Sequence, residues 1–247
     1  MRAALNSGAS VEAVYVDAAG RLDSDVGDVI EHVRAAGTRT FELAPGVMQK
    51  VADTVNPQAV CAVVGFVDRP LAEVLAGSGE GPLVVCVDVR DPGNLGAVLR
   101  VADASGARGV LCCGTSVDPY NPKVVRASAG SIFQVPLVIE ESAESAIAVV
   151  RAGGFRALAA VAHGGEDYAA SDLTGQVALL FGNEASGLDE ALLEGLDATV
   201  TIPIPGKAES LNVAMAAAVL CFESARQRRA STVIESTASG RISKERA

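Results

Sequence analysis

From residue 83 onward, short apolar runs alternate with Ala-rich segments of helical spacing. Leu83–Val89 is an almost continuous apolar run, as expected for a strand that is buried on both faces of a parallel sheet. Further strands are predicted at Gly109–Cys113, Phe155–Val161, Val177–Phe181 and Ala198–Ile202, and helices at Ser142–Ala152 and Leu211–Arg229. This alternation predicts an α/β domain over residues 83–229. Residues 230–247 are polar and lack periodicity, so they are interpreted as a flexible tail.

The first 70 residues show a shorter version of the same pattern. Strands are expected at Val11–Asp17, Thr38–Leu43 and Ala59–Val67, and a helix at Val26–Ala36. They predict a small α/β domain over 1–70, and the Gly/Ser/Pro-rich end of segment 71–82 indicates a linker. Met1 is followed at once by a helical segment that ends at Gly8. This start is compatible with a missing first helix or basic leader, which one sequence does not show.

Composition argues against several classes of protein. No apolar stretch reaches the roughly 20 residues of a membrane span, and no signal peptide is recognisable. The five cysteines lack C-x-x-C spacing and have apolar neighbours, which favours free thiols in the cytoplasm. His32 and His163 have no partners at metal-ligand spacing, so no metal is expected. The net charge of −10 requires any polyanion to be met by a local basic patch.

The first motif, at Asp91–Gly106, predicts a helix that follows a Pro-Gly turn. Asn94 is the expected N-cap, and the apolar positions i, i+3, i+4 and i+7 form a core-facing stripe at Leu95, Val98, Leu99 and Ala102. Arg100 lies on the opposite face, above Gly96 and Ala97, from where its guanidinium could reach back to an anion site at the helix start. The alternative is an ordinary surface arginine on a capped helix.

This turn does not match the common nucleotide loops. The Walker A pattern G-x-x-x-x-G-K-[ST] is absent from the sequence. A Rossmann fingerprint requires G-x-G-x-x-G, whereas here Gly93 and Gly96 have the wrong spacing. Dinucleotide binding is therefore disfavoured.

Another motif follows the last predicted strand. Ile202–Gly206 contains two prolines, which remove backbone donors and exclude a regular helix or a central strand. A rigid loop is therefore expected, with Ser210 capping a helix that begins near Asn212. A purely structural role, as a well-capped core helix with a basic end, is compatible with the same residues.

Together these segments carry a family resemblance. Asn94-x-Gly96-x-x-x-Arg100, Gly182-Asn-Glu184-x-x-Gly187 and Ile202-Pro-x-x-Gly206 with Ser210-Leu-Asn212 resemble the three motifs of the SpoU/TrmH branch of the SPOUT superfamily. Members of this branch are S-adenosylmethionine-dependent RNA ribose 2′-O-methyltransferases. The small N-terminal unit is similar to the ribosomal-protein-like RNA-binding domain of the members that modify rRNA.

The resemblance implies a parallel sheet with a deep C-terminal trefoil knot, a homodimer, and a methyl donor held by the knot loops. The residues that it places around S-adenosylmethionine are Gly182, Ile202, Leu211, Leu180, Phe181, Pro203, Ile204 and Gly206. The residues that it places at the reaction are Arg100, Asn94, Glu184, Ser210 and Asn212. Further contacts with RNA are expected from Arg126, Lys123 and Lys207.

The implied reaction is attack of a ribose 2′-oxygen on the sulfonium methyl group. The family attributes proton removal to the arginine that Arg100 matches, but a guanidinium stays protonated in proteins. Clamping of a phosphate and stabilisation of the developing oxyanion is the second role for Arg100, and the sequence does not choose between them. The two-domain organisation favours rRNA, with 23S rRNA as the expected target, over tRNA. The alternatives are a catalytically silent RNA-binding or ribosome-assembly protein of the same fold, and a small-molecule nucleotide-binding enzyme.

Overall fold

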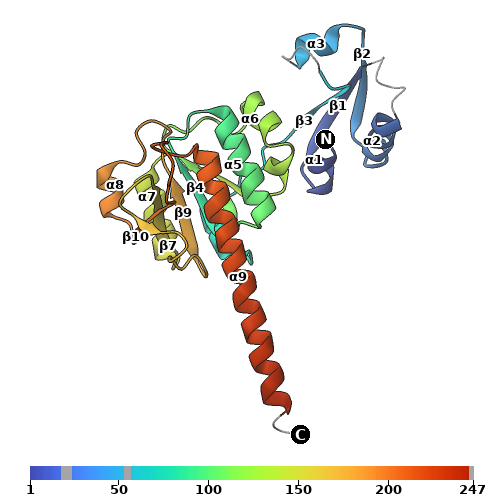
Figure 1. Cartoon of the computed structure of the whole chain (residues 1–247). Coiled ribbons are helices and arrows are strands. Elements are labelled where there is room, and N and C mark those ends of the chain that lie inside the picture. Colours follow the sequence, from blue (N-terminus) through green and yellow to red (C-terminus); the bar gives the residue numbers. More distant parts are fainter. Residues whose placement is uncertain (18–23, 53–56, 245–247) are drawn as a thin grey trace. The chain divides into compact units, whose positions relative to one another are not determined.

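A computed structural model describes residues 1–17, 24–52 and 57–244 of the chain. The chain divides into two compact units, Met1–Val67 and Asp68–Ala247 (Figure 1). The boundary therefore lies a few residues before the predicted one. Each unit has its own sheet and core.

Unit 1 is a three-stranded sheet with short helices. In chain order its elements are α1 (Arg2–Asn6), β1 (Val11–Asp17), α2 (Ser24–Ala35), β2 (Arg39–Leu43), α3 (Val47–Val51) and β3 (Val60–Val64). The strand order is β2-β1-β3, with β1 parallel to β2 and antiparallel to β3. The apolar residues at alternate positions of β1 pack against α2, and the buried cluster consists of Val14, Val16, Val29, Ile30 and Val33.

Unit 2 contains a seven-stranded parallel sheet in the order β6-β5-β4-β9-β7-β10-β8. Its strands are β4 (Leu83–Val87), β5 (Gly109–Cys113), β6 (Leu137–Glu140), β7 (Arg156–Val161), β8 (Glu166–Asp167), β9 (Val177–Phe181) and β10 (Ala198–Thr201). Its helices are α4 (Leu71–Ala76), α5 (Pro92–Ser105), α6 (Pro122–Ala127), the 3₁₀ turn η2 (Ser131–Phe133), α7 (Ala143–Ala152), α8 (Glu190–Glu194) and α9 (Val213–Lys244). Strands β4, β5 and β9 are buried at every residue, which confirms the burial predicted for Leu83–Val89 and the strands predicted at Gly109–Cys113 and Val177–Phe181.

Helices α5 and α9 pack against each other, and Figure 1 shows α9 continuing well beyond the sheet. The predicted stripe of α5 is confirmed, because Leu95, Val98, Leu99 and Ala102 are all fully buried. The predicted cap of α5 is wrong. Asp91 is the N-cap, its side chain accepting a hydrogen bond from the backbone N–H of Asn94, and Pro92 occupies the first helical position, which proline favours.

Two predicted irregular segments are helical. Residues 71–76, assigned to a linker, form α4, because Leu71 and Val74 are three residues apart and both are buried in the core of unit 2. Helix α9 does not end near Arg229 but continues to Lys244, so the irregular tail predicted over 230–247 is helical up to that residue. Extending an existing helix avoids the cost of nucleation, so a weak pattern suffices there.

Candidate active site

Three loops meet at the carboxyl edge of the parallel sheet in unit 2. They follow β4, β9 and β10 and span residues 88–91 with the first turn of α5 up to Asn94, residues 182–188, and residues 202–212. The carboxyl ends of parallel strands lie on one edge of a sheet, and ligands of open α/β sheets bind outside that edge. These are the three segments that the motifs singled out.

Asn94, Glu184 and Asn212 form a hydrogen-bonded chain that joins the three loops. The Asn94 side-chain amide donates to Glu184 Oε1 over 2.9 Å, and Asn212 Nδ2 donates to Asn94 Oδ1 over 2.7 Å. The partners are 90 and 118 residues apart in sequence. Each loop is therefore held to the next by a side chain.

Glu184 also fixes the turn that leads into α5. Its two carboxylate oxygens accept the backbone N–H groups of Arg90 over 3.3 Å and Asp91 over 3.2 Å. Burial acts to raise the pKa of this carboxyl group, but hydrogen bonds from Asn94 and from backbone N–H groups outweigh it, so the pKa is lowered. Glu184 is thus an anion held by donors, which suits a positioning residue rather than a proton acceptor.

Asn212, not Ser210, is the N-cap of α9. Asn212 Oδ1 accepts the backbone N–H groups of Ala214 over 2.9 Å and Met215 over 3.3 Å, and the helix begins at Val213. One asparagine side chain thus caps the helix with its oxygen and holds Asn94 with its nitrogen. The predicted cap at Ser210 is wrong by two residues.

Asn183 organises the loop after β9 and was not among the predicted site residues. Its Oδ1 accepts the backbone N–H groups of Ala185 and Ser186, and its Nδ2 donates to the backbone oxygen of Asp88 over 2.9 Å. Its backbone exchanges hydrogen bonds of 3.0 and 2.9 Å with Gly187. An asparagine directly after a buried strand is the signal that could have identified it, since its side chain readily satisfies loop donors.

A cavity of about 600 Å³ lies among the three loops. Its walls are apolar side chains and loop backbone, and its polar groups come from the hydrogen-bonded chain together with Asn183, Ser186 and Ser210. Nine of the predicted site residues line it: Asn94, Phe181, Gly182, Glu184, Ile202, Ile204, Ser210, Leu211 and Asn212. The volume lies within the ~300–1,000 Å³ that is usual for ligand sites.

Seven predicted site residues are not among those that line the cavity. Leu180 belongs to the fully buried core cluster, because neighbours on a strand face opposite sides and Phe181 takes the side of the cavity. The other six residues are all exposed: Arg100, Arg126, Lys123, Lys207, Pro203 and Gly206. The exposed cations remain available to a large ligand.

Gly96, which lies beneath Arg100 on α5, is covered by helix α6. A Cβ atom at Gly96 would lie 2.4 Å from Ala127 Cβ and 2.9 Å from Val124 O, so Gly96 serves the close packing of α5 on α6. Among the described residues Arg100 makes no side-chain hydrogen bond or ion pair. The side chain of Arg100 is exposed, and its reach to the start of α5 stays a prediction.

Two buried cysteines are poor nucleophiles. Burial raises the pKa of Cys113 to about 12 and that of Cys221 to about 12, so both remain thiols at neutral pH. All five cysteines are free. Within residues 1–17, 24–52 and 57–244, no cluster of His, Cys, Asp and Glu could hold a metal ion.

Both units match families of known proteins. Residues 81–222 match the SpoU rRNA Methylase family, and residues 2–69 match a domain described as RNA 2′-O ribose methyltransferase substrate binding. The 23S rRNA (guanosine(2553)-2′-O)-methyltransferase RlmP of Bacillus subtilis is 33% identical over 89% of this chain and 82% of its own length. A 23S rRNA (uridine(2479)-2′-O)-methyltransferase of Streptomyces viridochromogenes is 35% identical over 80% of this chain and 71% of its own length.

A solved structure has the same architecture. The SpoU methyltransferase AviRb from Streptomyces viridochromogenes, in complex with the cofactor AdoMet, superimposes with a TM-score of 0.82. It is 32% identical and covers 92% of this chain and 86% of its own. The fold similarity thus includes a relative that was solved with a methyl donor.

Proposed function

This chain belongs to the SpoU rRNA methylase family, and we propose that it methylates a ribose 2′-hydroxyl of rRNA, specifically 23S rRNA, with S-adenosylmethionine as the donor. The observation that carries the proposal is the hydrogen-bonded chain Asn212–Asn94–Glu184 at the 600 Å³ cavity. It unites the three motifs at one place. The two units match family models described as an rRNA methylase and as the substrate-binding domain of RNA 2′-O ribose methyltransferases.

The cavity fits S-adenosylmethionine chemically. Phe181, Ile202, Ile204 and Leu211 offer apolar walls for an adenine ring, and loop backbone offers hydrogen-bond donors and acceptors. Gly182 is buried directly against the backbone of Gly187, so the floor of the site is main chain rather than side chain. The bound donor would supply an electrophilic sulfonium methyl group. Pro203 and Gly206 would shape the loop without touching the ligand.

The roles of the polar residues follow from their contacts. Glu184, kept ionised by its donors, would hold Asn94 and the turn at residues 90–91 in place. Asn94 and Asn212 would orient the reacting ribose, and the exposed Ser210 hydroxyl would hydrogen-bond to donor or substrate. None of these groups is a strong base, so the 2′-hydroxyl proton would leave to solvent or to an RNA phosphate as the bond forms.

Arg100 would act from outside the cavity. Guanidinium groups are permanent cations in proteins, which argues against a role as general base and for clamping the phosphate next to the target ribose. The same charge would stabilise the developing oxyanion. Arg126, Lys123 and Lys207 are also exposed and would continue the path of the RNA backbone.

The proposed active form is a homodimer. Met215 is 62% exposed and Phe222 is 45% exposed. They are seven residues apart and so lie on one side of α9, and Leu211, four residues before Met215, precedes the helix. A second copy of the chain would cover this row. Analytical ultracentrifugation is expected to show a dimer that Met215→Glu converts to monomer; a dimer of undiminished stability in the variant would exclude this face.

The knot and the location of the protein are further parts of the proposal. Convergence of the loops after β9 and β10 on the start of α9 supports a knotted C-terminal region. The free cysteines and the rRNA substrate support a cytoplasmic location. Among the residues that the structure describes, none of the helices combines the length and apolar character needed to cross a bilayer.

Two experiments test the function. Calorimetry is expected to show binding of S-adenosylmethionine at one site per chain. Ribose methylation can be mapped in rRNA from cells without the gene. This rRNA is expected to lack one 2′-O-methyl mark, and the missing mark would identify the target nucleotide. Donor binding with an unchanged methylation map would favour the ribosome-assembly role, and absence of donor binding would contradict the proposal directly.

A further inference from the structure

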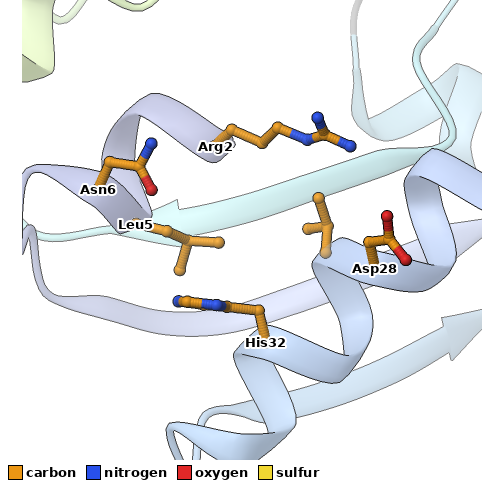
Figure 2. Close-up of a pocket in the computed structure, with 6 residues that line it drawn as sticks. Arg2, Leu5, Asn6, Asp28 and His32 are labelled. Atoms are coloured by element: carbon orange, nitrogen blue, oxygen red, sulfur yellow. The ribbon is translucent and has the colours of Figure 1, made fainter.

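Unit 1 contains a small cavity between α1 and α2 (Figure 2). Its volume is about 230 Å³, and it is lined by Arg2, Leu5, Asn6, Asp28, Val29 and His32. This is below the ~300–1,000 Å³ of pockets that hold drug-sized ligands. The cavity therefore suits one planar ring system rather than a complete nucleotide cofactor.

The lining separates into an apolar part and a polar edge. Val29 is buried in the core of unit 1, Leu5 packs against that core, and Figure 2 shows the His32 imidazole extending toward Leu5. Asp28 and His32 are four residues apart, so they lie on the same face of α2. A ring could therefore stack on the imidazole while its edge meets the carboxylate of Asp28.

The chemistry of the edge selects the ring. A carboxylate only accepts hydrogen bonds, so the part of the ligand that meets Asp28 must present N–H donors, whereas the Arg2 guanidinium in the same lining only donates and requires an acceptor such as guanine O6. Guanine presents two adjacent donors, N1–H and the N2 amino group, on its Watson–Crick edge, whereas adenine presents one amino group beside an acceptor. Stacking on aromatic side chains, histidine included, together with contacts to the Watson–Crick edge, is how proteins read single-stranded RNA.

Charge also favours recognition of a base over recognition of the RNA backbone. Residues 1–67 carry five basic and eight acidic side chains. A unit with this balance has little to gain from phosphate contacts, which dominate affinity in basic nucleic-acid binders. Yet residues 2–69 match a substrate-binding domain of RNA methyltransferases.

We propose that the cavity between α1 and α2 binds one unpaired guanine base of the RNA substrate, stacked on His32 and hydrogen-bonded to Asp28. The proposal rests on the proposed function for the identity of the RNA. It assigns unit 1 a base-specific contact, and it makes the substrate a loop or bulge with an accessible guanine.

Nucleoside titration tests the cavity by itself. The chain has two histidines, so the ring signals of His32 and His163 can be resolved by NMR and assigned with His32→Ala. Guanosine added to the full chain is expected to shift the His32 signal and to leave His163 unchanged. No shift with guanosine, or equal shifts with guanosine and adenosine, would overturn the proposal.

Methylation kinetics test its role in substrate binding. His32→Ala is expected to raise KM for rRNA about 5- to 160-fold, the range for loss of one stacked base, and Asp28→Asn is expected to raise it as well because it weakens the hydrogen bonds to the base edge. The turnover number and the dissociation constant of S-adenosylmethionine should stay the same. Glu31→Gln is the matched control, because it removes the same charge from an exposed position on α2 outside the cavity.

The outcomes separate this proposal from the function on which it rests. Equal KM values for Asp28→Asn and Glu31→Gln, in an enzyme that methylates rRNA normally, would overturn the guanine site alone. Failure of the wild-type chain to bind S-adenosylmethionine or to methylate rRNA would contradict the proposed function, whereas the guanosine titration would still report on the cavity.

Discussion

Gly182→Ala tests whether the loop after β9 forms the floor of the donor site. A Cβ atom at this position would lie 2.4 Å from Gly187 C, 2.5 Å from Gly187 O and 2.6 Å from Leu188 N. Ordinary contacts begin at 3.4 Å, so the facing backbone would have to retreat by about 1 Å. Backbone cannot move aside as a flexible side chain can.

The cost follows from the hydrogen bonds that this shift disturbs. The backbone of Asn183 and Gly187 is paired through bonds of 3.0 and 2.9 Å, each worth about 0.5–1.5 kcal/mol. Together with overpacking, we expect Gly182→Ala to lower the free energy of unfolding by ~1–3 kcal/mol. Glu184 lies within the displaced loop, so we also expect the affinity for S-adenosylmethionine to fall at least tenfold.

Gly206→Ala is the matched control for this substitution. Gly206 belongs to the same predicted set, but no atom lies within 4 Å of its Cβ position and its φ is not in the left-handed region. Urea unfolding and calorimetry on both variants would measure the two effects. If Gly182→Ala retained wild-type stability and affinity, the close approach of the two backbone segments would be refuted.

Three further substitutions address the rest of the site. Asn212→Ala should lower the free energy of unfolding by ~1–2 kcal/mol and reduce activity, because it removes the cap of α9 and the bond to Asn94, whereas Ser210→Ala should leave stability unchanged; urea unfolding compares them. Leu180→Ala should cost ~2–5 kcal/mol in the same assay while leaving the affinity of the folded protein for S-adenosylmethionine intact, and a selective loss of affinity would contradict its place in the core. The lowered pKa of Glu184 means that its contribution to stability is present above the unfolded-state pKa and is lost as pH falls through the lower folded-state pKa, so wild type and Glu184→Gln should converge in urea unfolding on acidification; a difference that is constant with pH would refute this.

The strands and the α5 stripe were predictable because local patterns determine them. Runs such as Val177–Phe181 are buried on both faces, and the stripe that begins at Leu95 follows helical period. The same rules could have excluded Leu180 from the cavity, since it alternates with Phe181 on one strand. Capping was harder, because Asp91 and Asn94 are both good caps and only Pro92 distinguishes them.

Other features depend on contacts that no local pattern contains. Gly96 is explained by α6, which packs on it from a segment about 30 residues away, and no pattern within α5 indicates this contact. Helix α4 was missed because it has only six residues and is followed directly by Gly77 and Ser78. Loops 182–188 and 202–212 could be placed together only through a resemblance to a known family, not from spacing.

The active site consists of loops whose contacts span most of unit 2, so its formation and its occupancy are thermodynamically linked. The Asn94–Asn212 bond closes 118 residues and the Asn94–Glu184 bond closes 90, so these contacts require the folded sheet beneath them. A ligand that binds only the folded state at 100 times its dissociation constant adds about 2.7 kcal/mol to the free energy of unfolding. S-adenosylmethionine at that concentration should give this increment in the wild type, and at most about 1.4 kcal/mol in Gly182→Ala at the same concentration if its affinity is tenfold lower or weaker still. An equal increment in both proteins would mean that the donor binds away from the converging loops.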